Sequence, residues 1–63
     1  MKIKVFNGTE YEYLEIYSLE IEKRNYGYSV TVYVQIQKRI EPLKVEFFSN
    51  WQEVMKWLQE VEE

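Results

Sequence analysis

The chain of 63 residues lacks four residue types altogether, Cys, His, Asp and Ala, and it has two Gly and one Pro. Without Cys it can form no disulfide, and without Cys or His the usual structural zinc sites are excluded. The same absences exclude nucleophilic catalysis by Ser-His or Cys-His pairs. Two isolated glycines, Gly8 and Gly27, cannot build a glycine-rich phosphate loop. We therefore expect no catalytic residues of these kinds and no cofactor.

Long apolar runs and an excess of positive charge are also missing. No run approaches the roughly 18 residues of a membrane span, and the N-terminal Met-Lys-Ile-Lys-Val-Phe leads into a strand pattern instead of a signal peptide. Eight Lys and Arg stand against eleven Glu, which gives a formal charge of −3. We therefore expect a cytoplasmic protein without membrane contact and without general affinity for the phosphate backbone of nucleic acids.

Aromatic residues are plentiful, with six Tyr, three Phe and two Trp. A chain this short buries only about 60% of the surface that its unfolded form exposes. Without disulfides or metals, a small domain depends on a dense aromatic core or on oligomerisation. No linker, repeat or low-complexity segment divides the sequence, so residues 1–63 are predicted to form a single domain.

Four breaks divide the chain into five segments: Asn7-Gly8, Asn25-Tyr26-Gly27, Glu41-Pro42 and Ser49-Asn50. The first four segments are rich in Val, Ile, Tyr and Thr with a period of two, which predicts strands. The last has apolar residues at helical spacing, and a capping box of Ser49 with Gln52, or of Asn50 with Glu53, would start the helix. We therefore predict an α+β fold: a four-stranded antiparallel meander sheet followed by one C-terminal helix packed on one face.

The first hairpin is predicted to turn through a three-residue loop, Phe6-Asn7-Gly8. This register sets Ile3 opposite Tyr11 on the core face. On the other face it sets Lys4 opposite Glu10, a pair of opposite charges directly across the ladder.

The later strands are predicted from their alternation. In the second hairpin Lys23 is predicted to pair with Tyr28. The same register then places Tyr17 opposite Val34. Pro42 is placed in the turn before the fourth strand because it has no N–H to donate. The inward residues of that strand are predicted to be Leu43, Val45 and Phe47.

Strand two breaks the pattern, because Leu14 and Ile16 fall on a face that otherwise carries Glu and Ser. A bulge near residues 14 and 15 would return both side chains to the core. If the strand is regular, Leu14, Ile16 and Tyr33 form an exposed apolar patch suited to a protein partner. The sequence leaves both alternatives open.

Element lengths indicate self-association. The two middle strands, of about 12 residues, would extend roughly 40 Å, whereas a helix of about 13 residues spans only about 20 Å. A second copy would have to cover the remainder, so we expect a homodimer or a larger assembly. The broad apolar face of the helix supplies the expected oligomer interface: Trp51, Met55 and Trp57.

The sequence also contains residues that could bind a metal ion or a nucleic acid. A Mg²⁺ site for a metal nuclease or nickase would have to come from the glutamates Glu10, Glu12, Glu15, Glu20 and Glu22. Single-stranded nucleic acid could bind beside Tyr26, Tyr28 and Tyr33. The basic residues for that alternative are Lys23, Arg24, Lys38, Arg39 and Lys44.

The order of four meandering strands and one C-terminal helix resembles the dimeric single-stranded-DNA-binding transcriptional-coactivator fold. It also resembles the small phage-encoded anti-CRISPR proteins that share this fold. The resemblance implies a dimer that binds either nucleic acid or a protein machine. Because the chain is net acidic, our leading hypothesis is a non-enzymatic, self-associating interaction module, an inhibitor from a phage or mobile element that acts on a host nucleic-acid-handling complex. A single-stranded nucleic-acid-binding protein is the alternative, and a Glu-dependent metal nuclease comes third.

Overall fold

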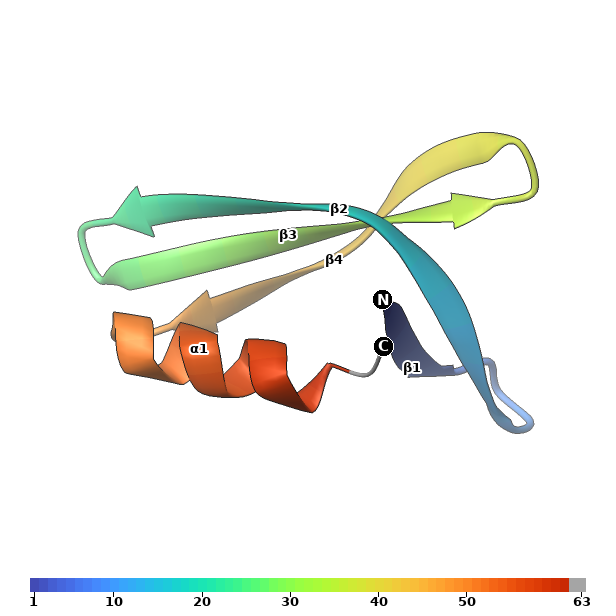
Figure 1. Cartoon of the computed structure of the whole chain (residues 1–63), viewed down its shortest axis with the longest axis horizontal. Coiled ribbons are helices and arrows are strands. Elements are labelled where there is room, and N and C mark those ends of the chain that lie inside the picture. Colours follow the sequence, from blue (N-terminus) through green and yellow to red (C-terminus); the bar gives the residue numbers. More distant parts are fainter. Residues whose placement is uncertain (62–63) are drawn as a thin grey trace.

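A computed structural model describes residues 1–61 of the chain. Four strands, β1 (Lys2–Phe6), β2 (Tyr11–Arg24), β3 (Gly27–Ile36) and β4 (Arg39–Phe48), precede one helix, α1 (Trp51–Glu60) (Figure 1). The strands form a single antiparallel sheet in the order β1-β2-β3-β4, so the predicted α+β meander is confirmed. Among the described residues, no helix has the length and apolar character needed to cross a membrane.

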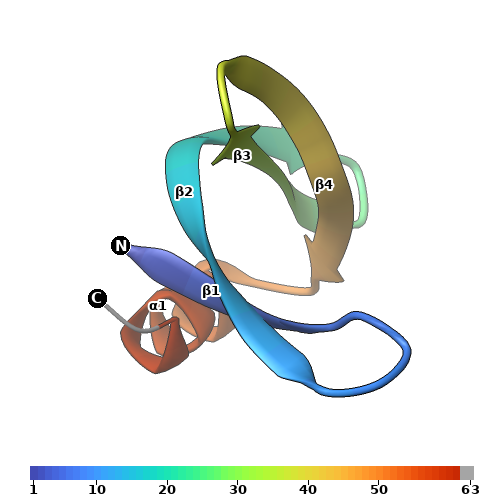
Figure 2. The same ribbon diagram turned by 90° about the vertical axis from the view of Figure 1, so that its right-hand side faces the viewer.

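The sheet is strongly twisted, and β2 bends so that β1 curls round to the side of the β2–β4 strands on which α1 lies (Figures 1 and 2). We call this the helix side and the opposite surface the outer face. The core lies where β1, the middle of the sheet and α1 meet. Its buried apolar residues are Ile3, Val30, Val32, Val34, Val54 and Val61. Around Ile3, Val32 and Val34 pack the partly buried residues Val5, Leu14, Ile16, Leu19, Leu43 and Trp57.

The predicted register of the first hairpin is wrong. Phe6 pairs with Tyr11, so the turn runs from Asn7 to Glu10 and Ile3 faces Leu14. The Asn7 Oδ1 atom accepts hydrogen bonds from the Thr9 and Glu10 amides at 2.9 and 3.0 Å. That side chain stabilises a four-residue turn in place of the predicted three-residue loop. The resulting register sets Ile3 opposite Leu14 on the core face and Val5 opposite Glu12.

The second hairpin has the predicted register near its turn, where Lys23 pairs with Tyr28. The predicted pairing of Tyr17 with Val34 is wrong, because the register shifts and Ile16 takes that place. A bulge in β2 therefore occurs, but at Tyr17 and Ser18 instead of residues 14 and 15. The bulge turns Leu14 and Ile16 toward the core, in agreement with one of the two alternatives.

Strand β4 differs most from its prediction. Lys44 and Glu46 pair with Val32 and Val30, whose side chains are buried on the helix side. The predicted inward orientation of Val45 and Phe47 is therefore wrong, since they alternate with these residues and lie on the outer face. Leu43, in contrast, packs against the core as predicted.

Pro42 lies within β4, opposite Tyr33, and not in the preceding turn. The turn itself is formed by Gln37 and Lys38, and Gln37 has a positive φ of 58°. The register shifts beside Pro42, which is consistent with a residue that cannot donate to a ladder and is tolerated at bulges on edge strands.

The helix begins at the predicted cap. Asn50 Oδ1 accepts a hydrogen bond from the Glu53 amide at 3.0 Å, and the Glu53 carboxylate accepts one from the Ser49 amide at 2.9 Å. Trp51 packs against Tyr28, with ring centroids 5.4 Å apart. Val54, three residues further along α1, is fully buried.

Candidate functional site

The outer face of β2, β3 and β4 carries three rows of side chains with different chemistry. Across the sheet, Glu20 aligns with Thr31 and Val45, and the next step aligns Glu22 with Ser29 and Phe47. The rows therefore run from acidic on β2 through hydroxyl-bearing on β3 to apolar on β4. Within residues 1–61 the one helix, α1, packs on the other side of the sheet, so no helix of the described chain covers this surface (Figure 1).

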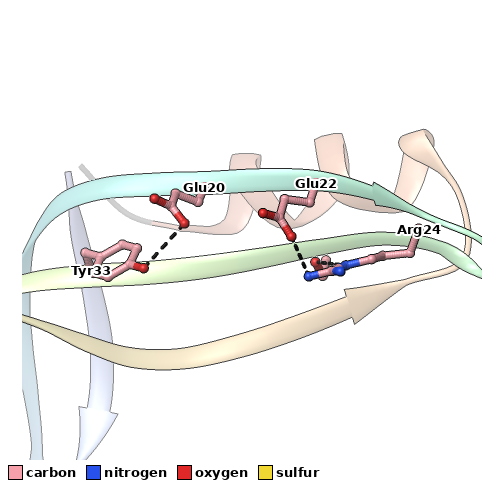
Figure 3. Close-up of polar contacts among 5 residues, drawn as sticks. Glu20, Glu22, Arg24 and Tyr33 are labelled. Atoms are coloured by element: carbon pink, nitrogen blue, oxygen red, sulfur yellow. Dashed lines mark hydrogen bonds and ion pairs between the residues drawn. The ribbon is translucent and has the colours of Figure 1, made fainter.

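The acidic and hydroxyl rows are linked by hydrogen bonds. The Tyr33 hydroxyl donates to Glu20 Oε1 at 3.3 Å (Figure 3). The negative charge of Glu20 raises the pKa of Tyr33 above 10.0, with smaller contributions from desolvation, from this hydrogen bond and from Glu22. At neutral pH the hydroxyl therefore keeps its proton and acts as the donor to the Glu20 side chain.

Arg24 closes the polar half of the outer face near the β2–β3 turn. Its Nε donates to Ser29 Oγ at 3.0 Å, and its guanidinium forms an ion pair with Glu22 (Figure 3). Ser29 is only 1% exposed, and the hydrogen bond from Arg24 satisfies its buried hydroxyl. Within residues 1–61, no buried side-chain nitrogen or oxygen lacks a hydrogen-bond partner. These contacts hold the polar side chains of β2 and β3 in place within the isolated chain.

The apolar row on β4 is exposed. We call Tyr26, Ile40, Val45 and Phe47 the outer patch. Phe47 is 62% exposed and Val45 47% exposed, and the Tyr26 ring meets the Phe47 ring edge-on with centroids 5.8 Å apart. Fully burying one such side chain is worth about 1.5–3 kcal/mol, so the patch leaves considerable hydrophobic free energy unused in the isolated chain.

The sequence did not predict the outer patch, because alternation shows which residues share one face of a strand but not which of the two faces the helix covers. The segment Leu43-Lys44-Val45-Glu46-Phe47 alternates apolar and charged residues. In the structure, Phe48 contacts Trp57 of α1, with ring centroids 5.8 Å apart, and this places the even-numbered residues on the helix side. A charged pair thereby lies beneath the sheet, with Lys44 Nζ 2.8 Å from Glu46 Oε2.

The residues predicted to bind a protein partner do not share a surface. Leu14 and Ile16 are partly buried against the core, whereas Tyr33 lies on the outer face and bonds to Glu20. Of the three, Tyr33 alone lies on the outer face, where it pairs with Pro42 of β4.

The basic residues considered for nucleic-acid binding are dispersed. Lys23 lies on the helix side, with its Nζ 5.2 Å from the centre of the Tyr28 ring. Lys38 is in the β3–β4 turn, at the opposite end of β3. Three of the five form ion pairs with a glutamate two positions away on the same strand: Arg24 with Glu22, Arg39 with Glu41, and Lys44 with Glu46.

The expected oligomer interface is partly exposed. Trp51 and Met55 lie one helical turn apart and both are exposed. Trp57 is half-buried and packs against Phe48. Ile21, on the helix side of β2, is also exposed, and α1 makes its main contacts with β3 and β4.

The structure brings no metal-binding cluster together within residues 1–61. Of the glutamates considered, Glu15 pairs with the N-terminal amine at 3.3 Å, and Glu20 and Glu22 are engaged by Tyr33 and Arg24. An open pocket of about 400 Å³ lies between β1, β4 and the end of α1. The pocket is lined by one carboxylate, that of Glu60, and by no pair of side chains that could act as nucleophile and general base. Its lining residues are Ile3, Lys4, Tyr13, Lys44, Trp57, Glu60 and Val61.

Comparisons with protein-family models, curated proteins and solved structures found no match for this chain. Its function therefore has to be inferred from the geometry of its surfaces.

Proposed function

We propose that this chain is a non-catalytic interaction module that self-associates and binds another protein through the outer face of its sheet. The observation that carries the proposal is the orientation of β4. Lys44 and Glu46 lie on the helix side, while Val45 and Phe47 face solvent. Local conflicts between sequence pattern and fold concentrate at functional sites, and an exposed apolar patch with a polar rim is typical of a protein-binding surface.

Overall dimensions support self-association. The accessible surface is 4907 Å², whereas a compact monomer of this mass has about 4,400 Å². The radius of gyration is 12.3 Å, against about 11 Å for a compact chain of this length. The single chain therefore leaves more surface uncovered than a self-sufficient domain does.

The acidic row favours a particular kind of partner. Glu20 and Glu22 share the outer face with the outer patch, across the hydroxyl-bearing row of β3, and the chain carries a formal charge of −3. Such a surface repels phosphates and complements a basic protein surface, such as the groove in which a protein holds nucleic acid. An inhibitor that a phage or mobile element directs against a host nucleic-acid-handling complex in the cytoplasm has this character, and it is the biological role we propose.

The test compares two exposed phenylalanines, Phe47 in the outer patch and Phe6 at the end of β1. The parent chain, Phe47→Glu and Phe6→Glu are each immobilised and exposed to a lysate of a candidate host. We expect a nucleic-acid-handling protein to be retained by the parent and by Phe6→Glu and lost from Phe47→Glu. Equal retention by both variants would contradict the proposal.

A second measurement addresses nucleic acid itself. A single-stranded oligonucleotide is titrated into the parent chain over a range of salt concentrations. Submicromolar affinity that falls steeply with salt would favour the nucleic-acid alternative over the protein partner.

A further inference from the structure

The free edge of β4 has the properties of a self-pairing strand. β4 is the last strand of the sheet, so only one of its edges is paired, with β3. Among the described residues, no backbone or side-chain hydrogen bond outside the β3–β4 ladder reaches β4 backbone groups. An edge of this kind presents unpaired N–H and C=O groups to a further strand.

We propose that two copies of this chain pair through β4, antiparallel about a two-fold axis at Val45, so that one sheet runs through both copies. The proposal rests on the self-association proposed above and names its interface. A two-fold interface must be self-complementary, because each residue of one copy meets the symmetry-related residue of the other.

Charge selects this register. Centring the axis on Val45 sets Lys44 opposite Glu46 of the second copy and Glu46 opposite Lys44 of the second copy. Opposite charges directly across an antiparallel ladder are favourable, and like charges are unfavourable. An axis at Lys44 would set that lysine against itself, and an axis at Glu46 would do the same with two carboxylates. Shifting by a single residue would set Val45 opposite a charged residue and mix the two faces.

The length of the edge fits the same register. The regular part of β4 begins after the bulge at Pro42 and ends at Phe48, before α1. Pairing about Val45 sets residues 43–47 of the two copies opposite one another, so it stays within this segment and leaves only Phe48 outside. Pro42 limits any longer pairing, because it cannot donate a ladder hydrogen bond and the strand bends beside it.

This pairing brings the outer patches of the two copies together. Val45 of one copy meets Val45 of the other across the axis, and each Phe47 lies diagonal to the opposite valine, within reach of an aromatic side chain. The two outer patches become continuous across the seam, so a partner would meet one apolar surface flanked by two acidic rows.

The free edge of β1, at the other end of the sheet, does not offer the same pairing of opposite charges. β1 carries Lys2 and Lys4, which lie on the same face of the strand. A two-fold axis at Ile3 sets Lys2 against Lys4 of the second copy, and an axis at Lys4 sets that lysine against itself. Pairing β1 with β4 of another copy would join the chains head to tail, which leads to open-ended assembly instead of a closed dimer.

A charge-exchange experiment tests the interface. Lys44→Glu alone places four negative charges at the seam, and Glu46→Lys alone places four positive ones, so each variant should raise the dimer dissociation constant about tenfold or more. Mixed together, the two variants should form a heterodimer, because every cross-strand pair is then opposite in charge. The double variant Lys44→Glu/Glu46→Lys should recover the homodimer.

The measurement is native mass spectrometry, with one variant isotopically labelled, supported by light scattering. Lys2→Glu is the matched control, since it reverses an exposed charge on β1, at the opposite edge of the sheet from β4, and it should leave the dissociation constant within about twofold of the parent value. Circular dichroism checks that each variant is folded.

The outcomes separate this interface from self-association itself. If the parent dimerises and no heterodimer forms, while Met55→Glu dissociates it, the β4 interface is wrong and the chain associates through α1. If the parent remains monomeric at the highest concentrations, both the interface and the proposed self-association are wrong. Selective heterodimer formation is the result that supports pairing through β4.

Discussion

Val30, which is fully buried in β3, pairs directly across the sheet with Glu46 of β4. Facing residues in a ladder project from the same side of the sheet. This single pairing therefore places a carboxylate on the helix side and leaves the neighbouring Val45 and Phe47 on the outer face.

The orientation of β4 can be tested with two consecutive phenylalanines. Phe48→Ala should lower the free energy of unfolding by about 2–4 kcal/mol, because it removes the ring that packs against Trp57. Phe47→Ala should change it by no more than about 0.5 kcal/mol, since that side chain is largely exposed. Urea unfolding of both variants, at a concentration where the chain is monomeric, provides the comparison. A larger loss for Phe47→Ala would show that β4 presents its other face to the helix.

The pKa of Tyr33 depends on Glu20. Glu20→Gln should lower that pKa toward 10.0, because the carboxylate charge is the largest cause of its elevation. A raised folded-state pKa means that the proton of Tyr33 contributes stability below pH 10, and this contribution is lost as the pH rises through the raised value. Phenolate absorbance, taken as the difference between parent and Tyr33→Phe, reports the midpoint. An unchanged midpoint in Glu20→Gln would argue against the contact.

The two glycines should differ in their tolerance of a side chain. Gly27 has a φ of 143°, and an added Cβ there would collide with the Phe48 and Ser49 carbonyls. Gly8 has a φ of 101° with open space around it. Gly27→Ala should therefore cost about 3 kcal/mol or more, through strain and overpacking, and Gly8→Ala about 1 kcal/mol. Thermal unfolding followed by circular dichroism measures both, and equal losses would contradict the close approach of β3 to the start of α1.

Oligonucleotide binding should be weak and insensitive to individual basic residues. Arg24, Arg39 and Lys44 are each paired with a glutamate. Four of the five candidate basic residues are divided between the two ends of β3, and Lys44 lies in the middle of β4. We expect dissociation constants no tighter than those of non-specific binding, roughly 10⁻⁴–10⁻⁶ M at physiological salt. Fluorescence anisotropy with a labelled single strand measures this. A tenfold loss on changing Lys38 and Arg39 to Ala would point to a site at the β3–β4 turn.

Several features could be predicted from the sequence because local patterns agree with one another. Alternation in β3 and the apolar spacing of α1 predicted the meander and the helix, and Asn50 with Glu53 predicted where the helix begins. The pairing of Lys23 with Tyr28 followed from matching two alternating strands across a short turn. These features depend on neighbours within a few residues, or on a single turn.

Tertiary structure decided the rest. The Asn7 side chain selected a longer turn, and the bulge at Tyr17 and Ser18 returned Leu14 and Ile16 to the core. The face that β4 presents to solvent depends on where its register shifts beside Pro42 and on the contact of Phe48 with Trp57. An alternating strand has two distinct faces by its sequence alone, but which one is covered depends on what packs against it. For that reason the outer patch became visible only in the folded chain.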